Sequence, residues 1–113
     1  MKKIEVWIKL FQLDRVKSAL RGAGVRGLTT TEVRRLADRG SGVASYRGVT
    51  YKSEFASKLK LEIVAHDDLV ERFVSTLVTL LQGGPSDDEE IIVTAIDDAL
   101  CIRTGEIAEA AIW

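Results

Sequence analysis

Both tyrosines of the chain lie in one short segment, Tyr46-Arg47-Gly48-Val49-Thr50-Tyr51, where an arginine and a glycine stand between them. It lies in a polar run over about residues 34–57. That run is longer than the ~12–15 residues usual for an unstructured connection in a compact domain. Long connections of this kind often carry function. The segment therefore predicts a surface that a partner binds or an enzyme modifies.

Residues suited to catalysis or metal binding are sparse. The chain has one cysteine, Cys101, and one histidine, His66, so it can form neither an intrachain disulfide nor a zinc site of the usual kind. No nucleophile–base pair and no pair of carboxylates in a pocket is evident. The acidic run Asp87–Glu90 could attract a hard cation, although such a run is more often a solvated turn. We therefore expect a protein that is not an enzyme and has no metal site.

The composition indicates one small domain. The 113 residues are 46% hydrophobic, and 16 basic against 17 acidic residues give a net charge of −1. A nucleic-acid-binding domain would carry a strong positive charge. No apolar run approaches the ~18 residues that a membrane span needs, and the first residues alternate in polarity, unlike a signal peptide. The lack of disulfides fits a reducing cytoplasm. We expect a cytoplasmic domain over residues 1–113 that binds no nucleic acid and does not insert into membranes.

The hydrophobic pattern predicts strands where apolar and polar residues alternate, and helices where apolar residues recur at helical spacing. The second helix is expected to begin at an Asp67 cap and to end before the glycines at 83 and 84. The stretch 37–45, rich in glycine and serine, is expected to lack regular structure. The predicted strands cover 3–9, 28–33, 58–64 and 91–95, with 99–103 as a candidate fifth, and the helices cover 14–24 and 67–81.

Two strand–helix–strand units in succession are typical of a ferredoxin-like α+β fold. Right-handed crossovers place both helices on one face of a four-stranded antiparallel sheet. Trp7 lies on the other face, because it is out of phase with Ile4, Val6 and Ile8. An extended apolar surface usually marks an interface. We therefore expect a homo-oligomer in which the open sheet faces pack together.

Several segments, in matching order and spacing, resemble the PII signal-transduction family along nearly the whole chain. The segment from Tyr46 to Tyr51 is similar to the family's Y-[KR]-G-[AS]-[AE]-Y motif. The other matching segments are Met1-Lys2-Lys3-Ile4-Glu5, Phe11-Gln12-Leu13-Asp14-Arg15-Val16, Thr31-Glu32-Val33, Lys58-Leu59-Lys60-Leu61-Glu62-Ile63-Val64 and Ile102-Arg103-Thr104-Gly105-Glu106. The resemblance implies a homotrimer with a long protruding T-loop, here about residues 36–56, and a C-terminal tail over 104–113.

The resemblance also implies a role in signalling. Members of the family bind ATP or ADP, often with 2-oxoglutarate and magnesium, in clefts between subunits. Their T-loops dock onto membrane transporters such as ammonium channels, or onto metabolic enzymes. On this chain the partner-binding loop would present Tyr46, Arg47, Gly48 and Tyr51. Tyr51 also falls at the position that is nucleotidylated in some members, although the two residues before it depart from the family pattern.

Specific ligand contacts follow from the same resemblance and fall into three groups. They are Thr29, Glu62 and Val64 for the adenine and ribose, Arg103 for phosphate, and Lys58 with Arg39 for a further ligand such as 2-oxoglutarate.

The phosphate-binding turn, at about 83–90, departs from the family pattern T-G-x-x-G-D-G-K. Only Gly84 and Asp88 match, and carboxylates replace two glycines and the lysine. Glycines let backbone N–H groups converge on phosphate oxygens. A like-charge contact at ~4 Å costs about 4 kcal/mol at an effective dielectric constant of about 20. Cys101 replaces a phosphate-binding arginine, and the base of the loop lacks the glutamine that helps hold magnesium and 2-oxoglutarate. These changes favour ADP or AMP over ATP with magnesium.

The preferred interpretation is a divergent PII-like regulator. It would sense a small-molecule effector, either ADP, AMP or bicarbonate, at clefts between subunits and control a transporter or enzyme through its T-loop. Three alternatives stay open: a ligand-independent trimeric adaptor, an ordinary nitrogen-sensing PII protein that binds ATP and 2-oxoglutarate, and a small trimeric metal-tolerance protein of similar fold. The match from Tyr46 to Tyr51 argues against the last of these.

Overall fold

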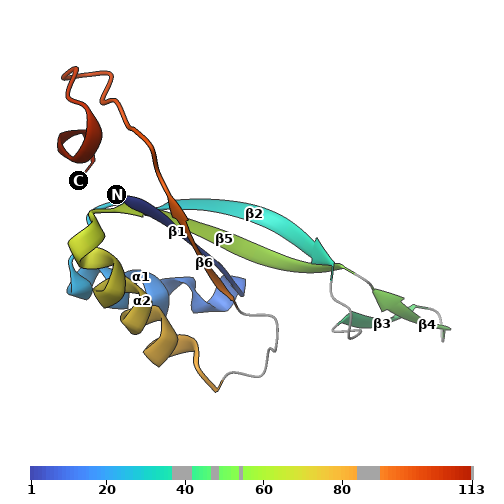
Figure 1. The fold of residues 1–113 in the computed structure, drawn as a ribbon. Coiled ribbons are helices and arrows are strands. Elements are labelled where there is room, and N and C mark those ends of the chain that lie inside the picture. The colour runs from blue at the N-terminus through green and yellow to red at the C-terminus, as the bar shows by residue number, and fades with distance from the viewer. Residues whose placement is uncertain (37–41, 47–48, 54, 84–89, 113) are drawn as a thin grey trace.

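The molecule consists of a four-stranded sheet with both helices packed against one face (Figure 1). The computed structural model describes residues 1–36, 42–46, 49–53, 55–83 and 90–112, with only the backbone described at 42–46 and 49–53.

The main sheet is antiparallel and has the strand order β2-β5-β1-β6. Its strands are β1 (Lys2–Ile8), β2 (Thr29–Leu36), β5 (Phe55–Ala65) and β6 (Ile91–Ala95). At the centre, Val6 of β1 lies opposite Leu61 of β5. β5 separates β1 from β2, which is the split arrangement of a ferredoxin-like fold. The predicted α+β fold is confirmed.

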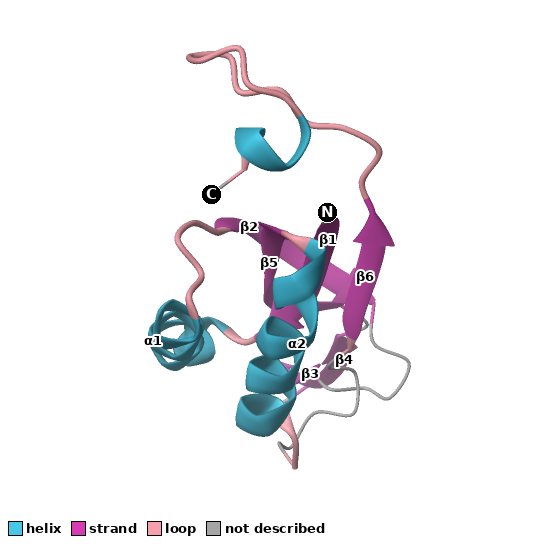
Figure 2. Cartoon of the chain, turned by 60° about the vertical axis from the view of Figure 1, so that its left-hand side comes forward, coloured by secondary structure: helices cyan, strands magenta, loops and turns pink. Residues whose placement is uncertain are grey.

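Two helices, α1 (Leu13–Ala23) and α2 (Asp67–Leu81), cover the same face of the sheet (Figure 2). A short 3-10 turn, η1 (Leu10–Gln12), leads into α1. The helix ends at Gly24, whose φ of 111° is left-handed and whose N–H donates to the carbonyl of Arg21 at 3.1 Å. Glycine adopts this conformation without a steric penalty, and it therefore sets the turn that leads into β2.

The hydrophobic core lies between the helices and the sheet. Alternate residues of β1 and β5 are buried on this face, and they meet buried residues spaced at helical intervals in α1 and α2. The largest fully buried side chains are Ile4, Val6, Ile8, Val16, Leu20, Leu61, Ile63 and Leu77. A shift of one residue in a strand would turn its apolar side chains outward. The core therefore also fixes which side chains of β1 and β5 reach the open face of the sheet.

The long connection between β2 and β5 contains a two-stranded hairpin, formed by β3 (Gly42–Tyr46) and β4 (Val49–Ser53). We call these two strands the arm, which lies beyond the ends of β2 and β5 (Figure 1). Tyr46 pairs with Val49 in this hairpin. The expectation that residues 37–45 lack regular structure is therefore wrong for 42–45. Aromatic and β-branched residues favour strands, and here they outweigh the local glycine and serine.

Asp67 is not the N-cap of α2, as the sequence predicted. His66 holds that position in an extended conformation, and Asp67 is the first helical residue. The carboxylate of Asp67 binds the amino-terminal ammonium of Met1 at 2.8 Å. This ion pair raises the pKa of the amino terminus, chiefly through the hydrogen bond with Asp67, and lowers the pKa of Asp67. The carboxylate is thereby engaged by the amino terminus and not by the backbone of the first turn.

The C-terminal segment, residues 96–112, leaves the end of β6, runs away from the sheet and then turns back toward the amino terminus (Figure 1). Glu109 Oε1 lies 3.7 Å from the amino-terminal nitrogen of Met1. The candidate strand over 99–103 is wrong. Instead, Leu100 forms an isolated bridge with Ile107, and the N–H of Cys101 donates to the carbonyl of Glu106 at 2.9 Å. Backbone contacts within the segment close this narrow turn, and a short 3-10 helix, η2 (Ala108–Ala111), follows it.

Candidate functional site

Three of the residues matched to a nucleotide site lie together on the open face of the sheet. Thr29, the first residue of β2, pairs with Glu62 of β5. Val64 lies two residues further along β5 and therefore points to the same face. Thr29 is exposed, whereas Glu62 and Val64 are half-buried. The fold thus brings the residues predicted to contact the adenine and ribose into one surface.

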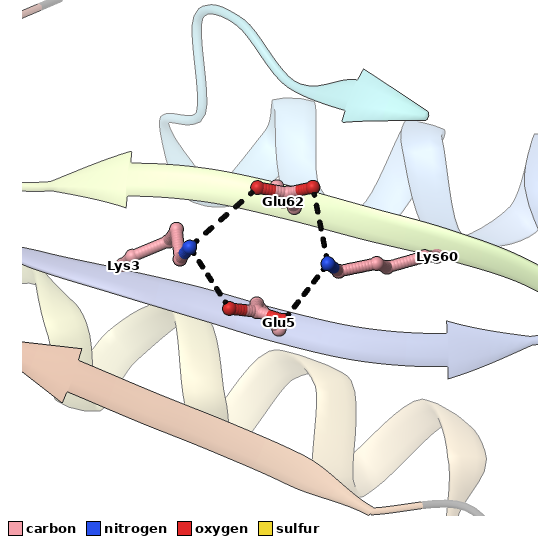
Figure 3. A network of polar contacts seen from close by, with 4 residues as sticks. All are labelled: Lys3, Glu5, Lys60 and Glu62. Atoms are coloured by element: carbon pink, nitrogen blue, oxygen red, sulfur yellow. Dashed lines mark ion pairs between the residues drawn. The ribbon is translucent and has the colours of Figure 1, made fainter. Parts of the chain in front are cut away.

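Glu62 belongs to a closed ring of four charged residues on β1 and β5 (Figure 3). Lys3 Nζ lies 3.0 Å from Glu5 Oε1 and 3.8 Å from Glu62 Oε2. Lys60 Nζ lies 3.3 Å from Glu5 Oε2 and 3.5 Å from Glu62 Oε1. The expectation of an apolar open face is therefore wrong for its centre, where charged residues stand. The ring also holds the carboxylate of Glu62 in place.

The ring shifts the pKa values of two of its members. Hydrogen bonding from Lys3, and then from Lys60, lowers the pKa of Glu5 against the opposing effect of burial. The hydrogen bond with Glu5 raises the pKa of Lys60, and the charge of Glu62 adds to this effect. The folded chain therefore favours the ionised form of both side chains.

Acid should remove the stability that the ring contributes. Because the pKa of Glu5 is lower in the folded chain, its contribution is present above the unfolded pKa and is lost as the pH falls through the folded pKa. Lys60 behaves oppositely, since its raised pKa means that its contribution is lost as the pH rises through the folded value. We expect Glu5→Gln to lower the melting temperature at neutral pH and to flatten its dependence on pH. Thermal unfolding between about pH 2 and pH 7, where carboxylates titrate, measures this.

The matched control is Glu71→Gln, which removes an exposed glutamate of α2. An acid slope that is the same for Glu5→Gln and wild type would contradict the assignment of this pH dependence to the ring.

The other ligand-matching residues are more dispersed. Lys58 lies on β5 opposite Val33 of β2 and is only 4% exposed. Arg103 is exposed in the narrow turn of the C-terminal segment, which rises away from the sheet (Figure 1). The residue matched to phosphate and those matched to adenosine therefore come from separate parts of the chain.

Most residues of the predicted partner-binding loop lack described side chains. Arg39, Arg47 and Gly48 lie outside the described residues. Tyr46 ends β3, and Tyr51 lies in β4 opposite Ala44, with only the backbone described. Modification of Tyr51 stays a prediction.

Sequence reasoning missed a contact that links the arm's supporting strand to the altered phosphate turn. The guanidinium carbon of Arg35, near the end of β2, lies 4.3 Å from the centre of the Trp7 ring. A nitrogen of the same guanidinium donates to the carboxylate of Glu90, which precedes β6. We call this the Arg35–Trp7–Glu90 bridge. It was missed because β2 was predicted to end at Val33, which left Arg35 in a loop.

The bridge reduces the unpaired negative charge expected at the altered phosphate turn. Glu90 replaces the lysine of the family pattern and was expected to act as an unbalanced negative charge. Instead its charge is paired with Arg35. The acidic residues between 84 and 89 lie outside the described residues.

The described ranges of the chain contain no cluster of three or more histidine, cysteine, aspartate or glutamate side chains suited to a metal ion. Within the same ranges, no helix has the length and apolar character needed to cross a membrane.

Comparison with known proteins connects this arrangement to a family. The profile described as nitrogen regulatory protein P-II matches residues 1–106. The chain is 42% identical over 112 residues to the nitrogen regulatory protein P-II of Cereibacter sphaeroides, which covers 99% of this chain and 100% of that protein. It is 44% identical over 106 residues to that of Bradyrhizobium diazoefficiens, covering 94% and 95% of the two chains.

Nitrogen regulatory protein P-II 1 of Escherichia coli K12 is 41% identical over 112 residues, which covers 99% of this chain and 100% of that protein. The resemblance seen in the separate sequence segments is therefore confirmed along nearly the full chain. The chain belongs to the nitrogen regulatory protein P-II family, whose members are signal-transduction regulators and not enzymes.

Proposed function

We propose that the chain forms a trimer that senses ADP or AMP in clefts between subunits and controls a transporter or metabolic enzyme through its arm. One arrangement carries this proposal. Thr29, Glu62 and Val64 share the open face of the sheet, whereas Arg103 is exposed on a separate segment. A nucleotide that contacts both groups is best accommodated if a neighbouring chain supplies Arg103. Closed symmetric assemblies commonly build sites in this way.

Exposed apolar residues in the C-terminal segment support the assembly. Ile102 is 96% exposed in the single chain, and Leu100 and Ile107 are 63% and 61% exposed. A group of large apolar side chains in water usually marks a protein–protein contact. Packing of this segment against a neighbouring subunit would bury these side chains and bring Arg103 to the neighbour's cleft.

Charge supports a ligand with few phosphates. The pairing of Glu90 with Arg35 balances one carboxylate of the altered turn, but the sequence places Asp87 and Glu89 there as well. A third phosphate would add negative charge beside these acids. Lys58, matched to a 2-oxoglutarate contact, is only 4% exposed, which limits access to its amino group. Both observations favour ADP or AMP over ATP with 2-oxoglutarate.

The Arg35–Trp7–Glu90 bridge offers a route from the cleft to the arm. β2 carries Thr29 at one end and Arg35 near the other, and the arm follows. A nucleotide phosphate near the turn would compete with Glu90 for positive charge or move the turn that holds it. The ligand would then shift the population of arm positions by its different affinity for them.

Breaking the bridge should loosen the end of β2. Exposed ion pairs contribute about 0.2–1 kcal/mol, and cation–π contacts about 0.5–1 kcal/mol at exposed sites. The Glu90 side chain is 54% exposed, so solvent screening places the ion pair at the low end of its range. Together the two contacts should stabilise this strand end by about 1 kcal/mol, which corresponds to about a fivefold change in the local opening equilibrium. We therefore expect Arg35→Ala to accelerate amide hydrogen exchange near the end of β2 by about fivefold.

Arg34→Ala is the matched control, because Arg34 is the neighbouring exposed arginine on the opposite face of β2. The paired change Arg35→Glu with Glu90→Arg should restore part of the protection. Equal exchange in Arg35→Ala and Arg34→Ala would remove the bridge from the mechanism.

Calorimetry with ADP, AMP, ATP with magnesium, 2-oxoglutarate and bicarbonate tests the proposed function. We expect ADP or AMP to bind with a dissociation constant below the millimolar range. We also expect this constant to be lower than that of ATP with magnesium. If none of these compounds binds below the millimolar range, the sensor proposal fails and a ligand-independent adaptor replaces it. Tight binding of bicarbonate alone would move the proposal to a bicarbonate sensor.

A further inference from the structure

We infer that a second ligand site, for a small molecule with an oxyanion head and a short apolar body, lies between the end of α1 and the start of α2. A hollow of about 350 Å3 is present there. Its walls are the turn after α1, the end of β5, the first turns of α2 and Ile112 of the C-terminal segment. This volume is at the small end of the range usual for ligand pockets. The inference does not depend on the proposed nucleotide function.

The charged side chains that line the hollow are two arginines, Arg26 and Arg72, and His66 lies beside them. No aspartate or glutamate among the described residues lines it. Arg72 Nη1 donates weakly to the carbonyl of Ala23 at 3.4 Å, which holds the guanidinium across the gap between the helices. The chain as a whole has a net charge of −1, so positive charge is locally concentrated at this hollow. Arginine binds phosphate and carboxylate groups in a planar, two-pronged geometry.

Neither acidic residue of the first turn of α2 lines the hollow. Asp67, at the start of α2, is engaged by the amino-terminal ammonium at 2.8 Å. Asp68 is exposed and does not line the hollow. The positive end of the α2 dipole lies on the same side and adds to the attraction for an anion.

The floor of the hollow is apolar. Val25, Ile63 and Phe73 are buried and line it, and the half-buried Ile112 adds a further aliphatic side chain to the lining. A bare inorganic anion would leave this surface without a partner. A ligand with a ring or short hydrocarbon attached to the oxyanion would fill the floor while the arginines bind its head.

Titration calorimetry with phenyl phosphate, benzoate and phenol tests this inference on the intact protein. Phenyl phosphate or benzoate should bind, and phenol, which has the same ring without the charge, should bind at least tenfold more weakly. Loss of one charge-assisted hydrogen bond weakens binding by about tenfold. We therefore expect Arg26→Gln and Arg72→Gln each to weaken binding by about tenfold. Both side chains are exposed, so these variants should fold normally.

Arg21→Gln is the matched control, because it removes an exposed arginine of α1 that does not line this hollow. Preference for phenyl phosphate assigns a phosphate head, and preference for benzoate assigns a carboxylate head. Three results would overturn the inference: phenol binding as tightly as the charged probes, an unchanged affinity in Arg72→Gln, or equal losses in Arg72→Gln and Arg21→Gln. A parallel loss of ADP affinity in the arginine variants would also overturn it, because Val64 borders the hollow as well as the proposed nucleotide site.

Discussion

Leu61→Ala should lower the free energy of unfolding by about 2–5 kcal/mol, the range for large-to-small changes in a packed core. Leu61 is fully buried at 0% exposure in β5, a central strand of the sheet, opposite Val6 of β1. Removing its side chain leaves a cavity that the rigid sheet cannot close. Because proteins are only marginally stable, this is a large fraction of the total.

Chemical denaturation at a fixed protein concentration measures this change, since the stability of an oligomer depends on concentration. The control is Leu61→Met, which keeps the volume and should cost less than about 1.5 kcal/mol. A loss below about 1 kcal/mol for Leu61→Ala would show that Leu61 does not lie in the centre of the core.

Arg103→Gln should weaken ADP binding by about 10- to 100-fold. A hydrogen bond to a charged group contributes about 1.5–3 kcal/mol, and each 1.4 kcal/mol is about tenfold in affinity. Arg103 is exposed in the C-terminal segment of the single chain, so its loss should leave the core unchanged. Calorimetry with ADP gives the affinity, and an unchanged melting temperature separates loss of contact from loss of fold.

Arg15→Gln serves as the comparison, because Arg15 is an exposed arginine of α1 away from the open sheet face. If Arg103→Gln binds ADP as tightly as wild type, the phosphate contact is misassigned. If Arg15→Gln loses as much ADP affinity as Arg103→Gln, the loss comes from the change in net charge and not from a contact that Arg103 makes.

The sequence predicted the main sheet and helices because each has a clear apolar period. The alternation of Ile4, Val6 and Ile8 marks β1, and Gly24 marks the end of α1. The arm was harder to predict, because glycine and serine near its start favour a loop. The pairing of β3 with β4 is not evident from these residues. Strand pairing depends on a partner elsewhere in the chain, which a local pattern does not reveal.

The candidate site was predictable only in part. Alternation places Glu62 and Val64 on one face of β5, but the register that sets Thr29 opposite Glu62 comes from the packed core. The charged ring and the Arg35–Trp7–Glu90 bridge join strands that are distant in sequence. No local spacing encodes such contacts, so they became visible only in the folded chain.

Each proposed nucleotide site contains residues from two chains, and co-assembly of two defective variants tests this arrangement. Thr29→Glu places a carboxylate beside Glu62 and should block the adenosine side of a cleft, whereas Arg103→Gln removes the phosphate contact. Each variant alone should bind ADP poorly. In randomly mixed symmetric trimers, about a quarter of the clefts would combine a native Thr29 with a native Arg103 from the neighbouring chain. We predict that the mixture regains tight ADP binding at about that fraction of sites, whereas a mixture that binds no better than the separate variants would contradict a shared site.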